Sequence, residues 1–217
     1  MSLTVLVDYE SGNLHSAEKA FQRMAQETGA GEVIVSSRPE DVARADRVVL
    51  PGDGAFPACR RALVAREGLY EAITEAATTR ARPFLGICIG MQMLATRGLE
   101  YVETPGFDWI GGEVTRIEPE IVPGAAHLKV PHMGWNDLVI DRPHPVLDGI
   151  ATGDHAYFVH SYQVRTADPA HLLAHVDYAG PITAIIGRDT IIGTQFHPEK
   201  SSATGLRIIA NFLKWAP

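Results

Sequence analysis

The sequence predicts an α/β fold in which a mixed, largely parallel central sheet is flanked by helices. In the first half, short apolar runs alternate with helix-periodic segments, which is typical of right-handed strand–helix–strand units. The second half carries short strand-like runs separated by turns before a final helix, so we expect it to be rich in antiparallel strands. With 217 residues, 46% of them apolar, we expect a single domain over residues 1–217.

The elements expected in the first half follow one another closely: a strand at 3–7, a helix at 14–28, strands at 33–35 and 47–50 around a short helical turn, a helix at 63–77 and a strand at 84–85. Binding sites in such sheets lie beyond the carboxyl ends of the strands. We therefore expect the turns after Val7, Leu50 and Leu85 to face one crevice.

The elements expected in the second half are short strands and one closing helix: strands at 109–114, 135–140, 156–161, 172–176, 182–186 and 190–196, a hairpin turn at 187–189, and an amphipathic helix at 201–215. A Pro- and Gly-rich segment at 118–126 is expected to be a surface loop.

Composition excludes several classes of protein. The net charge of −7 argues against a nucleic-acid partner. No apolar run is long enough to span a membrane, and the N-terminus lacks a basic signal region. Two cysteines form no disulfide framework, and no Cys/His cluster suggests a metal. We therefore expect a cytoplasmic location and no metal or cofactor.

The segment Gly86-Ile87-Cys88-Ile89-Gly90 carries the strongest chemical signal. A nucleophile flanked by glycines at i−2 and i+2, between a strand and a helix, is typical of a nucleophile elbow. The glycines keep both neighbouring segments clear of the nucleophile. The helix start after Cys88 would favour its thiolate. The alternative is a buried structural cysteine in a glycine-containing turn.

The turn Pro51–Phe56, with Gly52, Asp53 and Gly54 at its centre, allows three interpretations. A phosphate loop is disfavoured because the Lys-Ser/Thr pair is missing. A plain tight turn is the default for Pro-Gly. The third interpretation, a loop whose N–H groups face a developing oxyanion, is favoured by its expected place beside the elbow.

A nucleophilic cysteine needs a base, and His197 is the best candidate. It follows a predicted strand and precedes Pro198 and Glu199. In an extended segment, side chains at i and i+2 point the same way, so Glu199 would accept a hydrogen bond from His197 and fix its tautomer. Sequence alone does not bring this pair to Cys88, and six other histidines are assigned surface or structural roles: His15, His127, His144, His155, His171 and His175.

Taken together, these motifs resemble those of the class I (triad) glutamine amidotransferases, whose fold is flavodoxin-like. More specific stretches resemble the glutaminase subunits of imidazole glycerol phosphate synthases, which act in histidine biosynthesis. The matching stretches are spread over nearly the whole chain: Asp8-Tyr9, Gly12-Asn13-Leu14, Leu50-Pro51-Gly52, Gly54-Ala55-Phe56, Gly86–Gln92, Lys129–Asn136, Tyr157–Tyr162 and Gly193–Ser201.

The resemblance implies a catalytic triad of Cys88, His197 and Glu199. Cys88 would attack the amide carbon of glutamine, and His197, oriented by Glu199, would protonate the leaving ammonia. The oxyanion would be held by backbone N–H groups of Ile89 and of the loop Gly52–Asp53–Gly54. The family usually has a small apolar residue in place of Asp53, and we expect this carboxylate to point outward.

The same resemblance implies the substrate contacts. Gln92 matches a glutamine-binding position, and the backbone of Ser161 and Tyr162 would hold the α-carboxylate. Glu100 matches the position that binds the α-ammonium, with Glu103 as a substitute. Solvent-exposed surface roles are the alternative for Gln92 and Glu100.

The implied partner is a cyclase with a (β/α)₈-barrel fold, which forms a heterodimer with the glutaminase and uses its ammonia to make imidazole glycerol phosphate and AICAR. Asn13, Tyr157 and Lys200 match positions near that interface; ordinary surface roles are the alternative. Three other functions stay open: the amidotransferase of another pathway, a subunit without catalytic activity, and a cysteine peptidase. The Lys129–Asn136 stretch argues against the amidotransferase of another pathway. The intact triad argues against a subunit without catalytic activity, and Gln92 argues against a cysteine peptidase.

Overall fold

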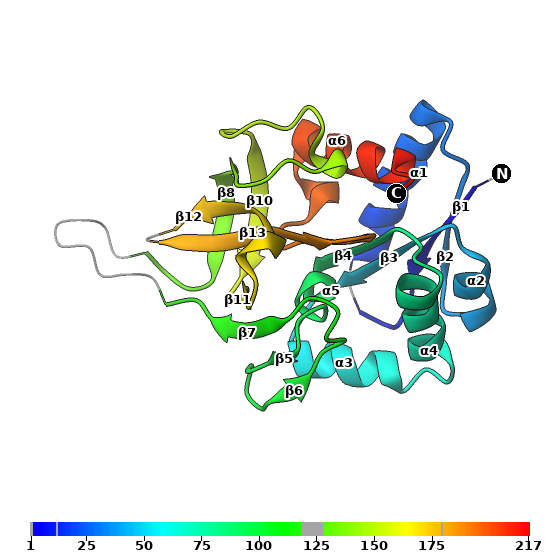
Figure 1. The fold of residues 1–217 in the computed structure, drawn as a ribbon, viewed down its shortest axis with the longest axis horizontal. Coiled ribbons are helices and arrows are strands. Elements are labelled where there is room, and N and C mark those ends of the chain that lie inside the picture. The colour runs from blue at the N-terminus through cyan, green and yellow to red at the C-terminus, as the bar shows by residue number, and fades with distance from the viewer. Residues whose placement is uncertain (1, 12, 119–127, 179) are drawn as a thin grey trace.

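The computed structural model describes residues 2–11, 13–118, 128–178 and 180–217. Its centre is an eight-stranded sheet with the strand order β2-β1-β3-β4-β14-β13-β12-β9 (Figure 1). The first five of these strands are parallel and the last three are antiparallel. The predicted mixed, largely parallel sheet is therefore confirmed.

The parallel strands form the buried core because their side chains face helices on both sides. Every residue of β1 and β4 is buried. In sheet order, the strands are β2 (Glu32–Ser36), β1 (Leu3–Val7), β3 (Arg47–Gly52), β4 (Phe84–Cys88), β14 (Ile191–Thr194), β13 (Pro181–Arg188), β12 (Leu172–Asp177) and β9 (Val139–Ile140).

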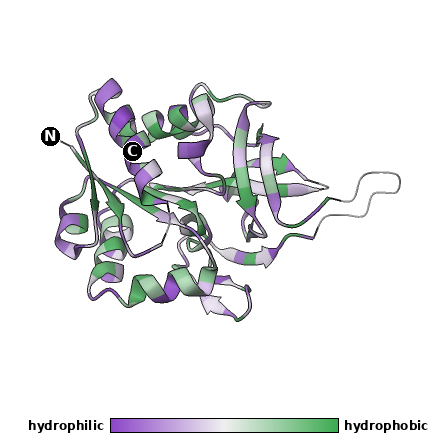
Figure 2. Cartoon of the chain, turned by 180° about the vertical axis from the view of Figure 1, so that it is seen from behind, coloured by the Kyte–Doolittle hydropathy of each residue, from purple (hydrophilic) through white to green (hydrophobic). Residues whose placement is uncertain are grey.

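Helices cover both faces of this sheet. On one face, α1 (Leu14–Thr28) packs against α6 (Ser202–Lys214), with Phe21 and Phe212 in edge-to-face contact. The other face carries α2 (Pro39–Arg44), α3 (Phe56–Val64) and α4 (Leu69–Thr74), which ends in a π-helical turn (Figure 1). Hydrophobic colour is concentrated on the central strands and hydrophilic colour on the outer turns of the helices (Figure 2), as expected for a core between sheet and helices.

Two smaller sheets extend from the antiparallel end of the main sheet (Figure 1). One is the antiparallel pair β8 (His132–Asp137) and β10 (His155–His160). The other has the order β11-β7-β5-β6, with bounds Tyr162–Thr166, Gly112–Arg116, Arg97–Gly98 and Thr104–Pro105. These sheets confirm the antiparallel-rich second half.

The helix predicted over 63–77 is wrong in its bounds. Its apolar spacing runs through Leu63, Leu69 and Ile73, which are all buried, but the chain breaks after Val64 because Gly68 adopts a left-handed conformation (φ 72°). The helix before the break, α3, was not predicted, although its first turn contains Pro57, a favoured helix-start residue.

The elements of the second half agree only in part with the prediction. The strand expected at 109–114 begins only at Gly112, and β11 was not predicted. The expected hairpin between β13 and β14 is present, with Asp189 at its turn (φ 51°). The surface loop predicted at 118–126 lies, apart from Glu118, outside the described residues.

Candidate active site

Cys88 lies at the end of β4 on a strained turn. Its backbone has φ 54° and ψ −110°, and the residue is 4% exposed. This conformation is uncommon for a non-glycine residue and is typical of a nucleophile elbow. The helix that follows, α5 (Ile89–Gln92), is only one turn long, so the helix predicted after the elbow is present but short.

The flanking glycines are required by close backbone approach. A Cβ on Gly90 would overlap the Leu50 carbonyl oxygen of β3, and one on Gly86 would lie 2.5 Å from the Gly90 carbonyl oxygen. No ordinary side chain fits such gaps. The elbow is thus packed tightly against the neighbouring strand, and this fixes the position of Cys88.

His197 and Glu199 form a buried pair beside the elbow. His197 Nδ1 lies 2.9 Å from Glu199 Oε1, and their side chains are 4% and 2% exposed. The pairing agrees with the sequence prediction, but the local geometry does not: Pro198 starts a 3₁₀ turn (Pro198–Lys200) instead of continuing an extended segment. His197 is brought to Cys88 because β14 pairs in parallel with β4.

The environment of His197 favours a charged imidazole. Burial opposes the charge, but hydrogen bonds with Cys88 and Glu199 outweigh it and raise the pKa of His197 to about 10. The imidazole beside the sulfur is placed to exchange a proton with it. The three residues therefore have the arrangement of a nucleophile, a base and an orienting carboxylate.

The loop after β3 lies beside Cys88, since Gly52 and Cys88 are register partners of neighbouring strands. Two of its N–H groups already have acceptors: Asp53 N–H donates to Ser11 Oγ (3.2 Å), and Gly54 N–H donates to the carboxylate of Asp53 itself (2.9 Å). Asp53 is exposed, as expected, but its carboxylate folds back onto the loop. In this conformation neither N–H group is free to bind an oxyanion.

For the glutamine hydrolysis that the resemblance implies, we expect Asp53→Ala to raise the rate of the isolated chain by about tenfold, because removing the carboxylate frees the Gly54 N–H group; a hydrogen bond of this kind contributes roughly 1–2 kcal/mol. Asp53→Asn keeps a side-chain oxygen as acceptor and serves as the control, with a rate near wild type. Steady-state glutamate release measures both. Equal activation of both variants would assign the effect to charge rather than to the hydrogen bond.

A cavity of about 250 Å³ opens next to Cys88 and collects most of the predicted substrate residues: Asp53, Gly54, Cys88, Ile89, Gln92, Glu100, Ser161 and Tyr162 line it, together with Pro131, Val159 and His160. The surface alternative for Gln92 and Glu100 is wrong, because they are 1% and 7% exposed. Glu103 instead pairs with Arg97 at the surface, so Glu100 is the carboxylate at the cavity.

Glu100 and Gln92, the two buried acceptors at the cavity, are held in place by hydrogen bonds. Glu100 Oε2 accepts the N–H of Phe56, the first residue of α3 (2.7 Å). The side-chain N–H groups of Gln92 donate to the Tyr162 carbonyl (3.2 Å) and to Gln195 Oε1 (3.0 Å). Within the described residues, Gln92 Oε1 is buried and has no hydrogen-bond partner. A hydrogen-bond donor of a bound ligand in the cavity would satisfy this oxygen.

Two further histidines at the site were not predicted from the sequence. His160 Nδ1 bonds the Tyr162 carbonyl (2.8 Å), so its Nε2 is an acceptor for His132 Nδ1 (3.1 Å), whose own Nε2 faces the Asn136 amide (3.2 Å). Burial lowers the pKa of His160 to about 3 and that of His132 to about 4. Both rings are neutral at pH 7 and link β8 to the wall of the cavity.

The second cysteine lies beneath the loop after β3. Cys59 is 3% exposed, and its Sγ lies 3.0 Å from Ser11 Oγ and 3.2 Å from the Asp53 carbonyl oxygen. Burial raises the pKa of its thiol. No chemistry is expected of Cys59 from the sequence, and its contacts support the loop rather than the cavity.

The three residues predicted at a partner interface have different environments. Asn13 caps α1 by accepting the Ser16 N–H group, and Lys200 is exposed. Tyr157 lies on β10, where its carbonyl accepts the His197 N–H group and its ring contacts Trp135. Trp135 is 52% exposed. Their role at an interface stays a prediction.

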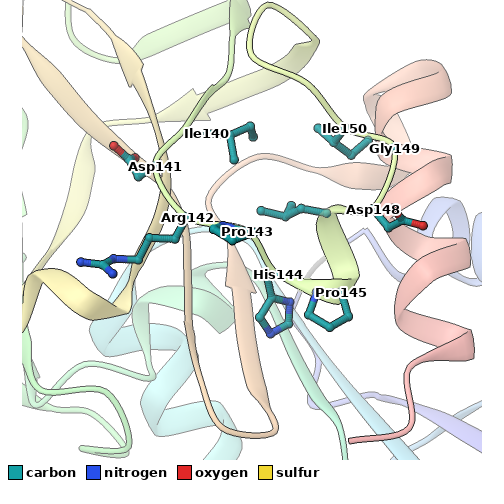
Figure 3. Close-up of a pocket in the computed structure, with 10 residues that line it drawn as sticks. Ile140, Asp141, Arg142, Pro143, His144, Pro145, Asp148, Gly149 and Ile150 are labelled. Carbon is teal, nitrogen blue, oxygen red and sulfur yellow. The ribbon is translucent and has the colours of Figure 1, made fainter.

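Another cavity, of about 750 Å³, lies in the segment from Ile140 to Ile150, away from the elbow (Figure 3). Its lining contains neither cysteine nor serine and none of the predicted site residues. Across the described ranges, no group of three or more His, Cys, Asp and Glu side chains is placed to hold a metal ion. In the same part of the chain, every helix is too short or too polar to cross a membrane.

Comparison with known proteins agrees with this geometry. Residues 5–215 match the family model for glutamine amidotransferase class-I. The chain is 75% identical to the imidazole glycerol phosphate synthase subunit HisH of Cereibacter sphaeroides, over 99% of this chain and 100% of the relative, and 66% identical to that of Ruegeria pomeroyi over the same shares.

A putative GMP synthase subunit from Thermoplasma acidophilum has the same fold, with a TM-score of 0.67, 19% identity and coverage of 99% of this chain and 93% of that one. The full-length family match and the high identities lead to one conclusion: this chain belongs to the class-I glutamine amidotransferase family and, within it, to the HisH subunits.

Proposed function

We propose that residues 1–217 form a single glutamine amidotransferase domain, the glutaminase subunit of an imidazole glycerol phosphate synthase, which hydrolyses L-glutamine to glutamate and ammonia. The observation that carries this proposal is the convergence of Cys88 and the buried His197–Glu199 pair on a cavity lined by Gln92 and Glu100. This site offers a nucleophile, a proton donor and buried acceptors for an ammonium group. It needs no cofactor.

The reaction follows from these positions. The Cys88 thiolate attacks the side-chain amide carbon of glutamine and forms a C–S bond, while the amide oxygen becomes an oxyanion. Collapse of this intermediate breaks the C–N bond, and the imidazolium of His197 gives its proton to the leaving ammonia. Water, deprotonated by His197, then cleaves the thioester, releasing glutamate and restoring the thiol. Glu199 keeps His197 oriented throughout.

The ends of the cavity set the direction in which glutamine binds. Glu100 and the free Gln92 Oε1 are acceptors suited to the α-ammonium group. The Ser161–Tyr162 backbone lies on the same wall and would hold the α-carboxylate. This places the side-chain amide at Cys88, with its oxygen toward the N–H groups of Ile89 and of the loop from Gly52 to Gly54 once that loop opens.

The partner would be a cyclase with a (β/α)₈-barrel fold, bound as a heterodimer. Free ammonia in water at pH 7 is protonated and loses its nucleophilicity, so a closed interface is needed to deliver it. The exposed side chains of Met133 and Trp135 on β8 lie beside Tyr157 of β10, and both residues belong to the Lys129–Asn136 stretch that resembles the family. This surface and the neighbouring Lys200 and Asn13 are the proposed docking positions.

We expect glutamate release by the chain alone to be slow and to rise strongly when the cyclase and its nucleotide ligand are added, because the loop amides are otherwise engaged. The Cys88→Ala variant, assayed under the same conditions, should lose this activity. Full activity of the chain alone would overturn the proposed dependence on the partner. The absence of activity under every condition would indicate a protein without catalytic function.

A further inference from the structure

Gln195 is a buried residue at the site. Neither its position in the sequence nor the triad explains its role. It follows β14, two residues before His197, and is fully buried. Its backbone N–H donates to the Ala184 carbonyl of β13 (2.8 Å), which anchors the residue at the end of the sheet. The side chain is therefore directed into the site by the strand itself.

The side-chain amide of Gln195 connects two groups of the active site. Its Nε2 donates to Cys88 Sγ at 3.7 Å, and its Oε1 accepts from Gln92 Nε2 at 3.0 Å. We propose that Gln195 is a positioning residue that stabilises the Cys88 thiolate through one end of its amide and orients Gln92 for substrate through the other.

The contact with sulfur acts on the charge of the nucleophile. A hydrogen bond to the charged form of a group favours that form. His197 lies on the same sulfur and supplies one donor, so Gln195 supplies a second, neutral donor that is not consumed when His197 gives its proton away. The thiolate released by thioester cleavage thus has two donors, the imidazolium of His197, which has just taken a proton from water, and the Gln195 amide.

The contact with Gln92 determines which atom faces the cavity. The two N–H bonds of Gln92 Nε2 are taken by the Tyr162 carbonyl and by Gln195 Oε1. Only Gln92 Oε1 remains, buried and without a partner among the described residues, next to the cavity. Because Gln195 offers an acceptor at this point, Gln92 is held with its own acceptor toward substrate. Without Gln195, the Gln92 amide would lose one of the two acceptors that fix its orientation, and only the Tyr162 carbonyl would remain.

Two variants separate these effects. Gln195→Glu keeps a side-chain oxygen for Gln92 but loses the donor to sulfur. Gln195→Met has a similar volume and loses both. Gln163→Met is the matched control, because Gln163 is also buried (4% exposed) and accepts a backbone N–H group, from Thr183, away from Cys88.

The first measurement is the pH dependence of alkylation of Cys88 by iodoacetamide, followed by mass spectrometry of the peptide that contains it. We expect the midpoint to rise by about 0.5–1 pH unit in Gln195→Met and by more in Gln195→Glu, whose carboxylate repels the thiolate. Gln163→Met should match wild type. Unchanged midpoints in both Gln195 variants, or an equal shift in the control, would overturn the proposal.

The second measurement, which depends on the proposed glutaminase activity, is the steady-state kinetics of the complex with the cyclase. Gln195→Glu should lower kcat with little change in KM, whereas Gln195→Met should also raise KM for glutamine by about fivefold to tenfold. Equal effects of the two variants on KM would overturn the orienting role. The alkylation profile needs no glutaminase activity, so failure of the proposed function is distinguished from failure of this inference.

If neither variant folds, the unmodified chain still tests the contact. The side-chain amide signals of Gln195 in an NMR spectrum should move when Cys88 is alkylated, because the amide then loses its thiolate acceptor. Unmoved signals would overturn the proposal.

Discussion

Glu199→Gln is expected to lower kcat for glutamine hydrolysis by about 10³–10⁴-fold without unfolding the chain. A neutral amide cannot stabilise the imidazolium of His197, and its N–H groups favour the wrong tautomer. Glu199 Oε1 lies 2.9 Å from His197 Nδ1, and Glu199 Oε2 has no hydrogen-bond partner in the described part of the chain, so the charge of the carboxylate is directed at His197. The measurement is the steady-state rate of the complex, with circular dichroism to verify the fold.

The Glu199→Gln variant is also expected to change the pH dependence of glutamine hydrolysis. Glu199 contributes to raising the pKa of His197 to about 10, so its loss lowers that pKa. Activity that needs a positive imidazole is lost as pH rises through this value, and the basic limb of the profile should therefore move to lower pH.

Asp141→Asn is the matched control for Glu199→Gln. It alters another histidine–carboxylate pair, His175 with Asp141 at 2.8 Å, outside the site. We expect its rate and pH profile to match wild type. A Glu199→Gln variant that kept more than a tenth of the wild-type rate would contradict the orienting role of Glu199.

Gly90→Ala is expected to lower the stability of the fold by about 4 kcal/mol, which corresponds to a melting temperature roughly 8–16 °C lower for a chain of this size. The added Cβ would overlap the Leu50 carbonyl oxygen, and both partners are backbone of buried, hydrogen-bonded segments. Neither can move without separating β3 from the elbow. Thermal unfolding followed by circular dichroism measures the effect.

Gly111→Ala provides the comparison for this variant. A Cβ at Gly111 would meet only the Ala167 side chain, at an ordinary 3.7 Å. Its melting temperature should stay within about 2 °C of wild type. If Gly90→Ala melted as high as Gly111→Ala, the close approach of the elbow to β3 would not be a requirement of the fold.

The parallel sheet was predictable because its strands are buried on both faces. Runs such as Leu3–Val7 are apolar at every position but Thr4 and show no alternation of apolar and polar residues, which is typical of a strand buried on both faces. The helix at 63–77 was misjudged because buried apolar residues, among them Leu63 and Leu69, occur on both sides of a break at Gly68, which has a left-handed backbone. The pattern of apolar residues along the sequence does not indicate a left-handed backbone at a single glycine.

In the site, residue type and spacing singled out Cys88, His197 and Glu199 as candidates, because each belongs to a short local motif, and their catalytic roles stay a prediction. Gln195 and the His132–His160 pair were missed, since their contacts join segments far apart in the sequence. Gln195 lies two residues before His197, just as Glu199 lies two residues after it. This spacing could have indicated Gln195 as a residue of the site. The direction of the Asp53 carboxylate could not be predicted from the sequence, because it depends on the conformation of the loop.

The position of β14 has a consequence for the order in which this protein is made. β14 is the last strand of the chain, yet it pairs between β4 and β13 near the middle of the sheet. Until β14 has left the ribosome, one edge of β4 is unpaired. Cys88 then lacks the base His197 and the neighbouring strand that buries it. A nascent chain in which β14 is still unpaired, or a chain truncated before β14, therefore exposes a reactive thiol and an unpaired apolar strand, and the active site forms only once β14 has paired.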